Sequence, residues 1–329
     1  MVPIEVCRVM PKVELHVHLE GSIRPETVLR LAERHGVALP ADTVEGLAEW
    51  YTFRDFPHFV EIYVAVSGCI RTPEDIEFIA REFLVGQAEQ NILWCEATYT
   101  ATTIARQSGI PWDEQIDALN RATEWGQKEL GVGMGLIIDI VRGRPIEEAL
   151  QTAEWVVGGR DRGVVALGLA GNEGVNETKL YQEAFDIALA VGMPIVPHAG
   201  ETQGAFSIRD CLEATQCKRI GHGIRCLEDA ALVKELRSSG VVLEVCPSSN
   251  VCLTAIPDLN HHPIAEMVEM GLAVTINSDD PPMFNTTLSD EFARCSAAFG
   301  WEEEELRGFA RTAAEASLCP DRDWLLERV

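Results

Sequence analysis

The sequence lacks several features that would assign it to common functional classes. Its ten cysteines never form a C-x-x-C pair, so the usual spacing of a zinc ribbon or a thiol redox motif is excluded. No apolar run reaches the length of a transmembrane helix, because even the stretch 131–141 is interrupted by Asp139. A basic patch is also missing, and the formal net charge is −25. Since that charge repels polyanions, we expect neither nucleic acid nor an anionic membrane as a partner.

Signals for export are equally scarce. Residues 1–8 lack the basic start and the apolar core of a signal peptide. Scattered cysteines fit a reducing compartment, and Cys95 and Cys246 lie inside apolar runs, where a thiol packs as a small hydrophobic side chain. We therefore expect a cytoplasmic protein.

Strand patterns alternate with helical ones along the 329 residues, of which 47% are hydrophobic. Short apolar stretches predict strands in eight places: one starting at Glu14, then 92–98, 134–141, 164–169, 194–198, 219–222, 241–245 and 272–277. Amphipathic runs predict helices at 27–35, 73–90, 113–130, 146–157, 178–191, 227–237 and 264–270, and one more that starts at a capping box of Ser207 and Asp210. Two further helices are predicted at 288–299 and 302–318.

These eight strand and helix units indicate an α/β fold, a single (β/α)8 TIM-type barrel domain over residues 1–329 with extra C-terminal helices. An open doubly wound sheet is the alternative, but no G-x-G-x-x-G loop follows the first strand. Residues 38–72 form a helical insertion rich in aromatic side chains. This insertion could be a lid over a site or a hydrophobic plug packed on the barrel.

Polar residues stand where the predicted strands end. His16 and His18 alternate with apolar residues, so both imidazoles project from one face of the first strand. Such a pair is half of a metal site, although in many strands it is simply solvated or hydrogen-bonded. His198 ends the fifth strand and Asp279 follows the eighth. Because the carboxyl ends of barrel strands meet at one end of the barrel, these four side chains should lie close together.

Nitrogen and carboxylate ligands with one open position suit a catalytic zinc. We therefore predict one Zn²⁺ ion bound by His16, His18, His198 and Asp279. Each of them could instead be a hydrogen-bonded core residue, but their joint placement favours a metal site. The other histidines outside the strand ends are interpreted as structural: His35, His58, His261 and His262.

Further residues near these ends suggest catalysis. Glu201 lies three residues beyond His198, within reach of a water at the metal, and is predicted to be the general acid and base. An exposed loop glutamate is the alternative. His222 would stabilise the hydroxide formed from that water, and Asp280 would face the substrate or His222. Gly171 could offer its backbone N–H to a ring acceptor, or it could be a turn glycine with a positive φ.

The residues stand in motifs that resemble the adenosine deaminase family. The motifs are Pro11-Lys12-Val13-Glu14-Leu15-His16-Val17-His18-Leu19-Glu20-Gly21, Leu169-Ala170-Gly171, His198-Ala199-Gly200-Glu201, Gly221-His222-Gly223 and Ser278-Asp279-Asp280-Pro281. Their order and approximate spacing match over almost the whole chain, although the His-x-His pair alone would also suit other barrel metallohydrolases, including phosphoesterases. The H-x-E and P-C-x-x-C pattern of cytidine deaminases is absent.

The resemblance implies a zinc-dependent barrel of the amidohydrolase superfamily that hydrolyses the exocyclic amine of a purine. By that analogy Glu201 protonates the purine ring while His222 steers the hydroxide. Asp280 bonds the imidazole side of the purine and Gly171 the pyrimidine side. His18 and Glu20 are also predicted to contact the substrate.

Departures from the family pattern concern the substrate. Adenosine deaminases commonly have aspartate where this chain has Glu20, one methylene longer, at the usual sugar-hydroxyl contact. Glutamate there also resembles bacterial and fungal adenine deaminases. Those, however, typically carry serine where this chain has Gly171, and Asp-His-Gly where it has Gly221-His222-Gly223, so a nucleoside is favoured.

We accordingly predict deamination of adenosine or deoxyadenosine to inosine or deoxyinosine, with release of ammonia. A modified nucleoside, 6-aminodeoxyfutalosine of the menaquinone route, is an alternative, and free adenine is the third. A substrate with a carboxylate would need a cation, for which the candidates are Arg24, Arg54 and Arg71. Outside the enzyme class, the chain could be a non-catalytic purine-binding barrel, but Glu201 and His222 argue against that.

Overall fold

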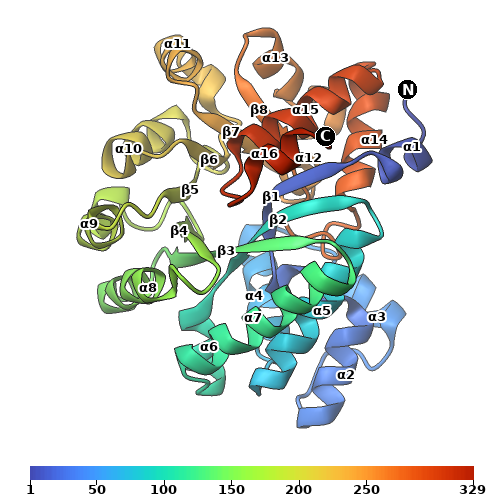
Figure 1. Ribbon diagram of the computed structural model, residues 1–329, viewed down its shortest axis with the longest axis vertical. Coiled ribbons are helices and arrows are strands. Elements are labelled where there is room, and N and C mark those ends of the chain that lie inside the picture. The colour runs from blue at the N-terminus through green and yellow to red at the C-terminus, as the bar shows by residue number, and fades with distance from the viewer.

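Eight parallel strands form one sheet in chain order, and helices surround it (Figure 1). The computed structural model describes residues 1–329. The strands are β1 (Lys12–His18), β2 (Ile92–Tyr99), β3 (Gly133–Val141), β4 (Val164–Ala170), β5 (Ile195–Ala199), β6 (Arg219–His222), β7 (Val242–Val245) and β8 (Ala273–Ile276). The sequence prediction of a (β/α)8 TIM-type barrel is therefore confirmed.

The barrel closes where β1 meets the segment after β8. The backbone N–H of His18 donates to the carbonyl of Asp279 at 2.8 Å, and the N–H of Asp279 donates to the carbonyl of His16 at 3.1 Å. Val17 and Asp279 form a parallel bridge. The first and last strands thus meet at the residues that were predicted to bind a metal.

Helices connect the strands and cover the outside of the barrel. The α-helices up to β5 are α1 (Ile4–Val9), α2 (Pro25–His35), α3 (Val44–Trp50), α4 (Phe56–Ser67), α5 (Pro73–Ala88), α6 (Ala101–Ser108), α7 (Trp112–Glu129), α8 (Ile146–Gly159) and α9 (Gln182–Ala190). Those after β5 are α10 (Ala205–Thr215), α11 (Ala230–Ser239), α12 (Pro247–Cys252), α13 (Ile264–Glu269), α14 (Leu288–Phe299), α15 (Glu303–Ala316) and α16 (Arg322–Leu326). None of them is both long enough and apolar enough to cross a lipid bilayer.

The start of α10 differs from the prediction. The helix begins at Ala205, so Ser207 lies inside its first turn and does not cap it. The hydroxyl of Ser207 instead donates to the carboxylate of Glu173, and the carboxylate of Glu228 accepts from the N–H of Ala205. Partners distant in sequence therefore replace the local capping box.

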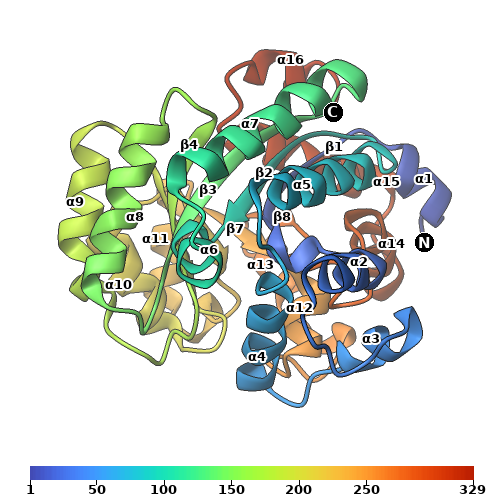
Figure 2. The same cartoon turned by 90° about the horizontal axis from the view of Figure 1, so that it is seen from below.

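The insertion after β1 contains α3 and α4. Both lie at one end of the barrel, and α16 lies at the other (Figure 2). Phe59 of α4 stacks on Phe284, with ring centroids 5.5 Å apart, and Phe53 packs edge-on against both rings. The insertion therefore packs on the loop after β8, and α4 also contributes side chains to the pocket described below.

Candidate active site

Four donor side chains meet inside the carboxyl end of the barrel. His18 and His198 place their Nε2 atoms 3.2 Å apart. Oδ1 of Asp279 lies 3.4 Å from Nε2 of His18 and 3.6 Å from Nε2 of His16. His16, His18 and Asp279 are buried, and His198 is partly buried. The structure therefore brings together every residue that was predicted to bind the metal.

These separations fit a tetrahedral zinc site. Ligand atoms about 2.05 Å from zinc at tetrahedral corners lie about 3.3 Å from one another, close to the distances observed here. Nε2 of His16 is buried and makes no hydrogen bond within the protein, so it is left for a metal that displaces its proton. Cys246 lies near His16, His222 and Asp279, but burial raises the pKa of its thiol well above the ordinary value, whereas zinc binds the thiolate.

Neighbouring groups fix how two of the imidazoles face the cluster. Nδ1 of His16 lies 3.1 Å from Oε2 of Glu244, and Nδ1 of His198 lies 3.1 Å from the carbonyl of Leu169. Because each acceptor takes the proton of Nδ1, each Nε2 presents a lone pair to the cluster. Glu244 is itself bonded to the buried Arg219. Such partners hold the rings in the orientation that a metal needs.

The three imidazoles differ in pKa because their surroundings differ. Burial lowers the pKa of His18 to about 4 and lowers the pKa of His198 well below its ordinary value. Burial also acts to lower the pKa of His16, but the nearby carboxylates of Asp279 and Glu244 reverse this and raise it to about 10. Metal binding at this cluster should therefore displace a proton from His16.

The backbone is strained at two residues of the site. His222 has a φ of 64° and Asp279 a φ of 65°. Side chains other than glycine seldom adopt this left-handed conformation, which costs about 1–3 kcal/mol and tends to occur at functional sites. The strain turns both side chains toward the same point, with Nε2 of His222 3.9 Å from Oδ2 of Asp279.

Glu201 lies beside this cluster, with 5% of its surface exposed. Its Oε2 is 3.8 Å from Nε2 of His222. Burial and the charges of Asp279 and Glu173 raise the pKa of Glu201 well above its ordinary value. It is therefore a buried acid that can hold a proton at neutral pH, not an exposed loop glutamate.

Glu173 holds the turn that carries Glu201. Its carboxylate accepts from the backbone N–H groups of Gly200, Glu201 and Thr202 at 2.7, 2.8 and 2.8 Å. No sequence motif predicts this role, although Glu173 stands only two residues after Gly171. A carboxylate with three backbone donors positions the whole turn.

His222 is positioned by a chain of hydrogen bonds. The N–H of Ile264 donates to Nδ1 of His262 at 3.1 Å, so Nε2 of His262 carries the proton. That atom donates to Oδ1 of Asn250 at 3.1 Å, and Nδ2 of Asn250 donates to Nδ1 of His222 at 3.2 Å. Nε2 of His222 therefore carries a proton that faces Glu201 and Asp279. Burial and the neighbouring His16 lower the pKa of His222 to about 4, so the ring is neutral.

The cluster opens into a cavity of about 130 Å³. The lining residues are His18, Phe56, Phe59, Val60, Tyr63, Val64, Thr100, Thr103, Asp139, Val141, Ala170, Gly171, His198, Glu201, His222, Leu253, Asp279 and Asp280. The volume is below the roughly 300–1,000 Å³ of most ligand clefts. Five of these side chains come from α4, so the insertion forms one wall of the site.

Three of the predicted substrate residues, His18, Gly171 and Asp280, line this cavity, and Glu20 does not. Oδ1 of Asp280 is buried without a protein partner. Gly171 has a φ of 92°, as the turn alternative expected, and its backbone also borders the cavity. Glu20 lies behind the wall, where its carboxylate accepts from the N–H of Thr100 at 2.8 Å and from the hydroxyl of Tyr63 at 3.3 Å.

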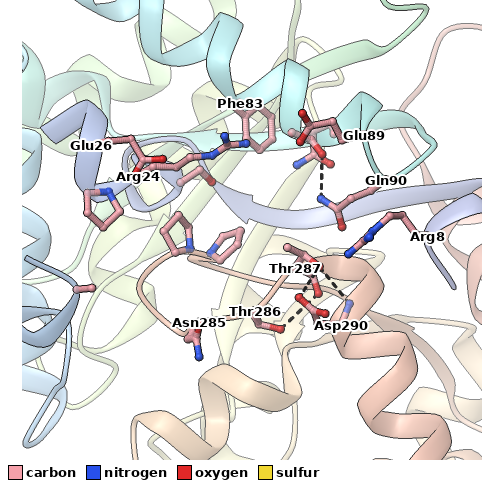
Figure 3. Close-up of a pocket in the computed structure, with 17 residues that line it drawn as sticks. Arg8, Arg24, Glu26, Phe83, Glu89, Gln90, Asn285, Thr286, Thr287 and Asp290 are labelled. Carbon is pink, nitrogen blue, oxygen red and sulfur yellow. Dashed lines mark hydrogen bonds between the residues drawn. The ribbon is translucent and has the colours of Figure 1, made fainter. Parts of the chain in front are cut away.

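A second cleft, of about 670 Å³, lies beside α2, α5 and α14 (Figure 3). Arg24, a candidate for recognising a substrate carboxylate, lines this cleft and not the cavity at the donor cluster. The guanidinium of Arg71 donates to the carbonyl of Gln107, and Arg54 does not line the cavity either. A substrate carboxylate must therefore lie beyond the cavity lining.

Comparison with known proteins agrees with this geometry. The family model described as adenosine deaminase matches residues 11–329. An aminodeoxyfutalosine deaminase of Streptomyces avermitilis is 39% identical, covering 94% of this chain and 86% of that protein. An adenine deaminase of Rhizobium meliloti is 37% identical, covering 96% of this chain and 97% of that protein. A crystal structure of an amidohydrolase from Burkholderia ambifaria, with bound zinc, is 25% identical with a TM-score of 0.90, covering 98% of this chain and 90% of that chain.

Proposed function

This chain belongs to the adenosine deaminase family, and from that premise we propose that it deaminates a purine nucleoside of the aminodeoxyfutalosine type. It is a hydrolytic deaminase that acts on a purine amine. Neither curated relative described above is an adenosine deaminase. The modified nucleoside named as an alternative in the sequence analysis therefore fits better than adenosine.

The lining of the cavity extends past the residues that would hold the purine, which supports a nucleoside as the substrate. Beyond Glu201 and Asp280, which would serve the purine ring, the lining continues to Thr100, Thr103 and Asp139 at the ends of β2 and β3. Free adenine has no substituent to fill that polar end. A sugar on the purine would supply hydroxyl groups there, and buried polar groups need such partners.

Free adenine is the second candidate. The cavity of about 130 Å³ suits a base better than a nucleoside as long as α4 keeps its place. The adenine deaminase relative, at 37% identity, supports the same substrate. A nucleoside would require α4 to move away from the cavity. Such a movement is the lid role considered for this insertion.

Deaminases of the amidohydrolase superfamily bind a divalent metal, and we propose one Zn²⁺ ion on His16, His18, His198 and Asp279 of a single barrel domain spanning 1–329. The separations and lone pairs described above support this ligand set. A bound ion would supply a Lewis acid that activates water. The other steps fall to residues of the chain itself.

In this proposal the protonated Glu201 donates its proton to the purine ring nitrogen next to the amine-bearing carbon and takes a proton from the attacking water. It then passes that proton to the amine, which leaves as ammonia, and recovers a proton from the new hydroxyl as the oxo group forms. The Nε2 proton of neutral His222 orients the attacking water. Asp280, whose pKa burial and Asp279 raise well above the ordinary value, donates to the imidazole side of the purine. The backbone N–H of Gly171 bonds the pyrimidine side.

The test is ammonia release by zinc-supplied protein from equal concentrations of aminodeoxyfutalosine, adenine, adenosine and deoxyadenosine. We expect kcat/KM for aminodeoxyfutalosine to exceed that for adenosine by at least about tenfold, because the sugar substituent reaches the cavity mouth. A faster reaction with adenine would favour the second candidate. No release from any of the four, with zinc bound, would refute the proposed function.

A further inference from the structure

Asp139 is a buried acid at the carboxyl half of β3 that none of the roles above uses. Its side chain lines the cavity, yet only 2% of its surface is exposed. Oδ1 has no hydrogen-bond partner in the protein. Because an unpaired buried acceptor costs free energy, its presence in the wall of a ligand cavity indicates a donor on the ligand.

We propose that Asp139 determines specificity by accepting a hydrogen bond from a hydroxyl group of the substituent on the purine, the sugar of a nucleoside. This inference rests on the proposed function, since it names the part of that substrate which the polar end of the cavity recognises.

The sheet makes room for this carboxylate. Asp139 pairs with Gly168 of β4 in the parallel register. A Cβ atom on residue 168 would lie 2.9 Å from Cβ and 3.2 Å from Cα of Asp139, closer than side chains normally approach. The glycine therefore leaves space for Asp139 inside the barrel, at the level of the cavity.

Nearby groups do not satisfy Asp139. The carboxyl group of Glu20 is already bonded to Thr100 and Tyr63, and burial together with the charge of Asp139 raises the pKa of Glu20 to about 8. Val64 and Val141 form apolar walls at this end, and the hydroxyl-bearing Thr100 and Thr103 line it as well, yet no group of the protein bonds Oδ1 of Asp139. The missing donor must therefore come from the ligand.

The acidic lining of the cavity limits which ligand groups can donate to Asp139. Its eighteen lining residues include Glu201, Asp139, Asp279 and Asp280 but neither lysine nor arginine. A phosphate or carboxylate at this end would meet only acidic groups, so nucleotides should be excluded. A neutral hydroxyl that donates to Asp139 is the group that fits.

The test separates the sugar from the base by using reaction products as ligands. Zinc-supplied protein is titrated calorimetrically with inosine, 2′,3′-dideoxyinosine and hypoxanthine. In the wild type we expect inosine to bind at least about tenfold more tightly than dideoxyinosine, the size of a hydrogen bond to a charged acceptor. Inosine monophosphate should bind at least about tenfold more weakly than inosine.

Variants assign the effect to Asp139. In Asp139→Ala the ratio of inosine to dideoxyinosine affinity should fall below about twofold, while hypoxanthine affinity changes less than about threefold. Asp139→Asn keeps a neutral acceptor and should give an intermediate ratio. Asp161→Asn, which removes an exposed carboxylate, should leave the ratio unchanged.

Stability provides a second readout. If Asp139 serves the ligand, both variants should melt at the same temperature as the wild type or higher, since an unpaired buried carboxyl is removed. Loss of stability in both variants with an unchanged affinity ratio would show a structural role and overturn the inference. An equal loss of hypoxanthine and inosine affinity would overturn it too.

The outcomes remain distinct from those for the proposed function. Fast turnover of adenine alone would refute the nucleoside substrate, yet a preference for inosine that depends on Asp139 would still support its contact with the sugar. Failure of the wild type to bind inosine at all would overturn both.

Discussion

Nδ2 of Asn250 donates to Nδ1 of His222 across 3.2 Å, and this contact determines which ring nitrogen of His222 carries the proton. Asn250 follows the seventh strand, whereas His222 ends the sixth. The amide therefore controls a group that faces Glu201 without touching the substrate cavity itself. A residue outside the cavity thus sets which nitrogen of His222 is protonated.

Replacement of Asn250 by alanine should release Nδ1 of His222, so that the proton moves between the two ring nitrogens. We expect kcat to fall by about 10- to 100-fold with KM changed less than about threefold, and the pH dependence of kcat to shift. Ser249→Ala, at the neighbouring buried hydroxyl, is the matched control and should retain kcat. A raised KM with normal kcat would contradict the positioning role.

Glu201→Gln should keep zinc and product affinity but lower turnover by at least about a hundredfold, because an amide cannot transfer the proton. Steady-state ammonia release, together with calorimetry of product binding, measures the two effects. Near-normal turnover would remove Glu201 from its role as general acid and base.

His18→Ala should reduce the zinc content of the purified protein well below one equivalent, since one ligand of the proposed site is lost. His261→Ala removes an exposed imidazole and should retain the metal. Metal analysis of the two folded variants decides the matter, and unchanged zinc in His18→Ala would defeat the ligand assignment.

Stability should depend on pH through Asp139. Burial raises its pKa from 3.8 to about 6, so the folded protein binds more protons than the unfolded chain between these values. The contribution of Asp139 to stability is therefore fully present below pH 4 and is lost as the pH rises to about 6. The loss is about 3 kcal/mol.

Asp139→Asn should lack this loss, although Asp280 in the cavity and Glu20 behind its wall titrate in both proteins. Urea unfolding of metal-free protein should show the variant becoming relatively more stable as the pH rises from 4 to 6. A constant difference across that range would show that the carboxyl of Asp139 is not perturbed.

Lys12 should be a structural cation at the other end of β1. Burial lowers its pKa to about 7, but the carbonyls of Cys7, Met10 and Gln90 lie 2.6–2.7 Å from Nζ and match the three protons of an ammonium group. Lys12→Met leaves these carbonyls unpaired and should lower the free energy of unfolding by about 3–5 kcal/mol. Denaturant unfolding measures this difference. A decrease in the free energy of unfolding of less than about 1 kcal/mol would exclude Lys12 as a structural cation.

The fold could be predicted from sequence because its signals are local. Buried parallel strands appear as short apolar runs, and turn glycines and helix starts separate them. The donor residues could also be predicted, since the ends of barrel strands converge whatever the details of packing. The positions of the strand ends were enough to group the four predicted ligands without knowledge of any side-chain contact: His16, His18, His198 and Asp279.

The supporting residues could not be predicted in the same way. Glu244 reaches His16 across 228 positions of sequence, and His262 acts on His222 only through Asn250. Ser207 misled the capping-box rule because its hydroxyl bonds Glu173, 34 positions away. Partners of this kind depend on how strands and loops pack in space, which spacing along the chain does not encode.

The contact that closes the barrel, between β1 and the segment after β8, joins residues that are synthesised at very different times. His16 and His18 leave the ribosome early, but they meet Asp279 only after roughly 260 further residues have been made. At about 5–20 residues per second, this takes on the order of ten to fifty seconds. Throughout that interval the nascent chain holds two imidazoles without their carboxylate, so the donor cluster can form only after Asp279 has been made.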